Sequence, residues 1–119
     1  MTVVTVKFYN NVPQGISVTE SGTTTDTYAL LASIECGGFS RKTIIVANTD
    51  AANSLTYEIR CYAYNGSTIP YEEVSDTALG AGALAITDIQ KSYALIEVYV
   101  KSTVAGSAAT VQCDISGYK

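Results

Sequence analysis

Three carboxylates that lie close together in the chain, Glu72, Glu73 and Asp76, are the first candidates for catalysis. A glycosidase sets two carboxyl groups roughly 5 to 10 Å apart across a cleft, one as the acid and the other as the nucleophile or base. Neighbouring residues on a β-strand point to opposite faces of the sheet, so Glu72 and Glu73 cannot form such a pair. We interpret these carboxylates as solubilising charges on an edge strand, where they oppose pairing with other sheets.

An activated serine or cysteine nucleophile would have no imidazole base, because the chain contains no histidine. Ser-His-Asp and Cys-His arrangements both need a histidine to take the proton of the nucleophile. The glycine-containing stretches GGF and LGAG do not lead into the Lys-Ser/Thr of a phosphate-binding loop. The sequence therefore predicts a protein that is not an enzyme and has no catalytic or cofactor-binding residues.

Metal ligands are equally sparse. Cys36, Cys61 and Cys113 show no Cys-x-x-Cys spacing, and a zinc site without histidine would need all three thiolates and a carboxylate. Residues 48–53 offer oxygen atoms to calcium but too few carboxylates, and capping of a compact turn explains the same residues. We predict no bound metal. The cysteines are interpreted as buried reduced thiols, with one disulfide between sheets as the alternative.

Length and charge limit the class of protein. The chain has 119 residues, which suits one domain whose core needs no metal or disulfide. Of these residues 47% are hydrophobic and only 15% charged, and the net charge is −4. Seven basic residues without a cluster argue against nucleic acid and anionic membranes as partners. We also expect no secretion signal, since the first residues lack its pattern, and no membrane-spanning segment.

Alternating apolar and polar residues recur along the chain and predict short β-strands separated by turns. In SLTYEIRCYAY the residues expected to face a core are Leu55, Tyr57, Ile59, Cys61 and Ala63. In TYALLASIEC the residues expected to share one face are Tyr28, Leu30, Ala32, Ile34 and Cys36. Further strands are expected at residues 2–9, as a central strand in RKTIIVANTD (residues 41–50), as edge strands at residues 72–74 and 83–86, and in the last two alternating runs.

This pattern predicts an all-β fold, a single antiparallel β-sandwich of immunoglobulin-like or jelly-roll-like type with little or no helix. We expect one domain over residues 1–119. Residues 1–16 are either part of that domain or an N-terminal arm whose strand is exchanged with a neighbouring subunit.

The chain contains nine tyrosines and no tryptophan, so tyrosine is the main source of aromatic rings for the predicted surface. Only one face of each sheet in a sandwich meets the core, so rings on the opposite face are expected to be exposed. Exposed apolar patches mark contact surfaces, in which tyrosine is enriched. The alternative is that tyrosine favours strands and covers the sheet by cross-strand pairing. We predict an interaction surface formed by Tyr62, Tyr64, Tyr93, Leu95 and Tyr99.

Two stretches, KTIIVANTDAANSLTYEIRCYAY and ALIEVYVKSTVAGSAATVQCDISGYK, give residues 42–119 a low charge and abundant Thr, Ala and Gly. In this composition the chain resembles the small β-sandwich proteins of viruses and phages, among them capsid decoration (cement) proteins and tail-associated modules. The resemblance implies a non-enzymatic, oligomeric virion component that clamps capsid subunits. It also implies assembly in the host cytoplasm without an export signal.

The first functional hypothesis is therefore a structural protein of a virus or phage particle, located in the virion. Its expected partners are further copies of itself, in a homo-oligomer, and a major capsid protein or another virion protein. A carbohydrate-binding β-sandwich module is the alternative, since such modules stack sugars on exposed aromatic rings. A pilus or filament subunit is the second alternative.

Overall fold

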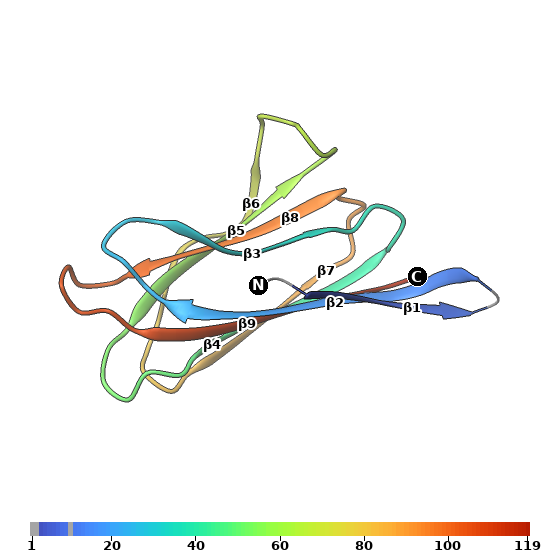
Figure 1. Ribbon diagram of the computed structural model, residues 1–119. Coiled ribbons are helices and arrows are strands. Elements are labelled where there is room, and N and C mark those ends of the chain that lie inside the picture. Colours follow the sequence, from blue (N-terminus) through green and yellow to red (C-terminus); the bar gives the residue numbers. More distant parts are fainter. Residues whose placement is uncertain (1–2, 10) are drawn as a thin grey trace.

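The structure is a computed structural model that describes residues 3–9 and 11–119 (Figure 1). The predicted first strand begins at residue 2, which lies outside the described residues. Within them there are nine strands and no helix, hence none that could cross a membrane. The strands are β1 Val3–Tyr9, β2 Val12–Thr23, β3 Ala29–Glu35, β4 Arg41–Asn48, β5 Leu55–Tyr62, β6 Tyr71–Leu79, β7 Leu84–Ile89, β8 Leu95–Ser102 and β9 Thr110–Tyr118.

The strands form two antiparallel sheets that lie one over the other as a sandwich (Figure 1). One sheet has five strands in the order β1-β2-β9-β4-β7, and the other has four in the order β3-β8-β5-β6. The predicted all-β sandwich is confirmed. The expected edge strands at residues 72–74 and 83–86 are also confirmed, because β6 and β7 end their sheets.

The core lies between the central strands of the two sheets. Strands β4, β8 and β9 bury every second side chain. Ile44 of β4, Ile59 of β5 and Ile96 of β8 are fully buried, and Ile115 of β9 is 1% exposed. Burial of such side chains is the main force that holds two amphipathic sheets together.

The predicted face of β3 is wrong at its first residues. Ala32 and Ile34 are buried as expected, but Leu30 is 50% exposed. The cause is a bulge, since Leu30 pairs with Tyr99 of β8 and Ala32 pairs with the next residue, Val98. The extra residue reverses the alternation, so residues before the bulge face the other way.

All three cysteines are buried, as predicted, and their thiols are free. Ala63 does not face the core, because β5 ends at residue 62 and Ala63 is exposed. Asn48 and Asp50 cap the β4–β5 turn, as expected. The Asn48 Oδ1 atom accepts the Asp50 N–H at 3.0 Å, and Asp50 Oδ2 accepts the N–H of Asn53 at 2.8 Å.

Residues 1–16 were predicted to be either part of the sandwich or an exchanged arm. In this structure β1 pairs with β2 of its own chain. The end of β1 and the start of β2 reach past the body of the sandwich on the side where the C-terminus lies (Figure 1). All seven residues of β1 are exposed, and exchange between subunits stays a prediction.

Candidate interaction face

The outer face of the four-stranded sheet carries a network of tyrosines, acids and cations. We call it the tyrosine–arginine face. It is made by two residues on β5 and three on β8, with one each from β6 and from the segment before β3. Its members are Tyr28, Glu58, Arg60, Asp76, Glu97, Tyr99 and Lys101.

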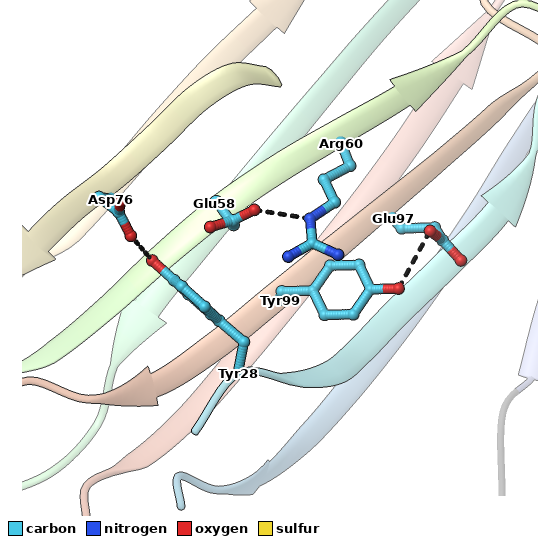
Figure 2. A network of polar contacts seen from close by, with 6 residues as sticks. All are labelled: Tyr28, Glu58, Arg60, Asp76, Glu97 and Tyr99. Carbon is cyan, nitrogen blue, oxygen red and sulfur yellow. Dashed lines mark hydrogen bonds and ion pairs between the residues drawn. The ribbon is translucent and has the colours of Figure 1, made fainter. Parts of the chain in front are cut away.

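The register between β5 and β8 sets the centre of this face. Glu58 lies opposite Tyr99, and Arg60 lies opposite Glu97. In this arrangement Arg60 Nε donates to Glu58 Oε2 at 2.6 Å, and the Arg60 guanidinium carbon lies 3.9 Å from the centre of the Tyr99 ring (Figure 2). The carboxylate of Glu58 is nearly buried, with 5% of its side chain exposed, so Arg60 compensates a charge held away from water.

Two tyrosine hydroxyl groups extend the network to both sides of Arg60. The Tyr99 hydroxyl donates to Glu97 Oε1 at 3.2 Å, and the Tyr28 hydroxyl donates to Asp76 Oδ1 (Figure 2). Asp76 has φ 42° at an irregular point of β6, where its pairing with β5 shifts register. Lys101 Nζ lies 4.7 Å from the centre of the Tyr28 ring. The rings are thus held in fixed positions by charged neighbours.

Burial and acidic neighbours make the tyrosines of this sheet weaker acids. The pKa of Tyr62 is raised to about 12, mainly by loss of water around the phenol and secondly by a hydrogen bond to Glu97. Loss of water and then the charge of Glu97 also raise the pKa of Tyr99. In the core, burial raises the pKa values of Cys61 and Cys113 to about 12. All of these groups hold their protons more tightly in the folded protein.

We therefore expect the free energy of unfolding to fall as the pH rises from about 9 to about 12. In this window the unfolded chain releases protons from its Cys and Tyr side chains at ordinary pKa values, while Tyr62 and Cys113 of the folded chain keep theirs. Urea midpoints measured at successive pH values test this. Cys113→Ala should give a shallower decline than the wild type, and a midpoint that stays constant across the window would contradict the prediction.

The predicted interface residues lie in three different environments. Tyr62, Leu95 and Tyr99 are partly exposed on β5 and β8 at or beside the tyrosine–arginine face. Tyr64 follows the end of β5 and is 64% exposed. Tyr93 lies just before β8 and packs against the core. Their role as an interface stays a prediction.

Tyr93 belongs to a second aromatic group at one end of the sandwich. Its ring stacks on Tyr71 at a centroid distance of 6.2 Å, and its hydroxyl donates to Glu73 Oε1 at 3.2 Å. Lys91 forms an ion pair with Glu73 at 3.3 Å and lies 4.7 Å from the centre of the Tyr71 ring. Tyr93 thus contacts residues of its own subunit and packs against the core, and its part in an interface stays a prediction.

The sequence prediction missed six of the seven members of the face, namely Tyr28, Glu58, Arg60, Asp76, Glu97 and Lys101. The alternation in β5 already placed Glu58 and Arg60 on the side opposite the core. The sequence alone does not reveal that Tyr99 of β8 lies under Arg60 of β5. Tyr28 was predicted to share one face with Ala32 and Ile34, because the bulge in β3 was not predicted.

The tyrosine–arginine face presents phenol rings, carboxylates and cations on the outer side of the sheet. Among the described residues no group of three potential metal ligands occurs. One face of the Tyr99 ring is covered by Arg60, which reduces the ring surface available for stacking on a sugar. A depression of about 300 Å³ lies elsewhere, beside Arg41, Thr43 and Asp88 of the five-stranded sheet. The geometry fits contact with a broad surface better than enclosure of a small molecule.

No protein-family model matches the chain, and no curated protein sequence matches it. Solved structures do share its fold. A protein of Bacillus endospore appendages, which form disulfide-linked pili, has a TM-score of 0.54 at 12% identity over 99% of this chain and 90% of its own. The protein PirA has a TM-score of 0.55 at 11% identity, covering 84% of this chain and 93% of its own.

A viral protein shares the fold as well. VP2 of infectious bursal disease virus, from a subviral particle, has a TM-score of 0.53 at 15% identity. The match covers 88% of this chain and 32% of the viral chain. At these identities the similarities establish the class of the molecule, an antiparallel β-sandwich that also occurs in pili and in viral particles, and no activity follows from them.

Proposed function

We propose that the chain is a non-enzymatic structural subunit of a virus or phage particle. In this role it decorates or cements a capsid, or accompanies another virion protein, and it binds the protein lattice through the tyrosine–arginine face.

The observation that carries this proposal is the fixed arrangement of Arg60 and Tyr99. Tyrosine and arginine contribute most strongly to protein–protein binding when they are held in place before contact. Here the guanidinium lies 3.9 Å from the ring centre, and Glu58 and Glu97 restrain the two side chains through hydrogen bonds. A partner would thus meet a surface that loses little conformational entropy on binding.

The composition and the fold are consistent with this role. The low proportion of charged residues is typical of chains that are packed against other protein, and the same sandwich fold occurs in a viral particle protein. The fold also occurs in endospore pili, so a filament subunit is the second candidate. Electron microscopy of the concentrated protein separates the two, because a filament subunit forms fibres and a decoration protein does not.

The proposed binding face is tested by co-sedimentation with purified particles of the virus whose genome encodes the chain. We expect the wild type to sediment with the particles and Tyr99→Ala to bind about tenfold or more weakly, because truncation removes a central aromatic contact. Val104→Ala is the matched control, since Val104 is 62% exposed in the β8–β9 turn, outside the face. Particles that retain neither wild type nor control would contradict the proposal.

A further inference from the structure

One side of the sandwich forms a step. The five-stranded sheet extends one strand beyond the four-stranded sheet, because β3 packs over β2 and none of the nine described strands packs over β1 to a comparable extent. Val4 and Val6 of β1 lie opposite Val18 and Ile16 of β2, whose side chains belong to or pack against the core. Their own side chains therefore face the open side of the step, where they are 45% and 36% exposed.

A groove of about 450 Å³ runs along this step, lined by Val4 and Ile16 from one sheet and by Ser33, Ile34 and Glu35 from the other. The strand β3 ends its sheet here, so the outer edge of its backbone is available for pairing. One additional strand beside β3 would form backbone hydrogen bonds with it and cover the apolar side chains of β1 and β2. The groove thus has the shape and chemistry of a site for an extended peptide segment.

We propose that this segment is β1 of a second copy of the chain, and that two copies interlock their steps around a two-fold axis parallel to the strands. In this arrangement β1 of each copy lies beside β3 of the other, and the apolar faces of the two β1 strands pack together. Because β1 and β3 run in the same direction, the new pairing is parallel (Figure 1). Each sheet of one copy then continues into a sheet of the other.

Charge supports a second copy as the occupant. Lys7 is the only charged residue of β1, and Glu35 is the only charged residue of β3. The side chains of Lys7 and Glu35 lie on the outer faces of their sheets, because each residue directly follows one whose side chain faces inward, Val6 in β1 and Ile34 in β3. In the interlocked dimer Lys7 of one copy comes within reach of Glu35 of the other, once at each of the two junctions.

Self-complementarity gives the second argument. Each copy supplies both a projecting apolar strand and a groove that accepts one, so the contact closes in a dimer and leaves neither uncovered. The opposite edge of the four-stranded sheet is less suitable. If β6 of a second copy paired with β3 instead of β1, its irregular pairing with β5 would disturb the contact. The charged residues of β6 are all acidic, so they would also repel Glu35 of β3.

Sedimentation velocity of the purified full chain tests the dimer without any other component. We expect a monomer–dimer equilibrium that Val4→Asp shifts about thirtyfold or more toward monomer, because a charge would be buried at the centre of the contact. Ile86→Asp is the matched control. Ile86 is 60% exposed on β7, the other edge strand of the same sheet, and this variant should dimerise as the wild type does.

A charge exchange tests the pairing of β1 with β3 directly. Lys7→Glu and Glu35→Lys should each weaken the dimer about three- to tenfold, since each places like charges together. The double variant should restore wild-type affinity, because the two charges are exchanged across both junctions. Circular dichroism confirms that each variant is folded, and all substituted side chains are exposed in the single subunit.

A wild-type chain that stays monomeric at the highest attainable concentration would overturn the inference. So would a dimer that is insensitive to Val4→Asp, or one in which the double charge variant fails to recover. The inference goes beyond the proposed function, because it concerns a surface separate from the tyrosine–arginine face. Loss of particle binding in Tyr99→Ala with an intact dimer, or the reverse, therefore distinguishes the two.

Discussion

Arg60→Met is expected to lower the free energy of unfolding by about 2 to 3 kcal/mol, because it leaves the carboxylate of Glu58 without its cation. The Glu58 side chain is only 5% exposed, while that of Arg60 is 27% exposed. The expected cost lies below that of breaking a fully buried pair because water reaches the position of Arg60. Urea unfolding followed by circular dichroism measures the change.

Two further variants show whether the unpaired charge is the cause. Adding Glu58→Gln to Arg60→Met removes that charge and should recover part of the lost stability. Lys101→Met removes a cation that lies 4.7 Å from the centre of the Tyr28 ring without pairing with a buried acid, and it should cost no more than about 1 kcal/mol. Equal losses for Arg60→Met and Lys101→Met would contradict the explanation.

Asn48→Ala should destabilise the fold by about 3 kcal/mol, since it leaves buried backbone groups without partners. The residue Asn48 is only 2% exposed. Its side-chain amide donates hydrogen bonds to the backbone carbonyl groups of Asn53 and Leu79, both at 2.9 Å. Its oxygen also accepts the Asp50 N–H. This one amide therefore joins the turn after β4 to the end of β6 in the other sheet. The urea midpoint of the variant provides the measurement.

Asn65→Ala is the control for the Asn48 prediction. Asn65 is exposed in the loop after β5, and its side chain donates to Glu35 at the surface. Its loss should change the free energy of unfolding by no more than about 0.5 kcal/mol. If Asn48→Ala were as mild as Asn65→Ala, the two carbonyl groups would have found other partners, and the proposed link between turn and sheet would be wrong.

The strands were predictable because alternation reports which side of a sheet is buried. In β5 the sequence places Leu55, Tyr57, Ile59 and Cys61 inward, and all four are buried. The face of β3 could not be predicted at its start. A bulge adds one residue without changing the composition, and the alternation of Leu30, Leu31 and Ala32 has no polar residue to reveal the change of phase.

The candidate face was predictable only in part, for a related reason. Of its members, Tyr99 follows from the alternation in its own strand. The neighbours of Tyr99 depend on which strands are adjacent and in which register, and these are long-range properties that one strand does not encode. The contact of Arg60 with the ring of Tyr99 could not be predicted either, because the two residues are far apart in the chain.

The positions of β8 and β9 within the sheets affect synthesis of the protein. The last two of the nine described strands in chain order are both inner strands, since β8 lies between β3 and β5 and β9 lies between β2 and β4. Until they emerge, the earlier strands can pair only as β1–β2, β4–β7 and β5–β6, β3 has no partner in its sheet, and neither sheet can be completed. The nascent chain therefore keeps much of its apolar core surface uncovered until β8 and β9 have been synthesised, and a chaperone would act during that interval.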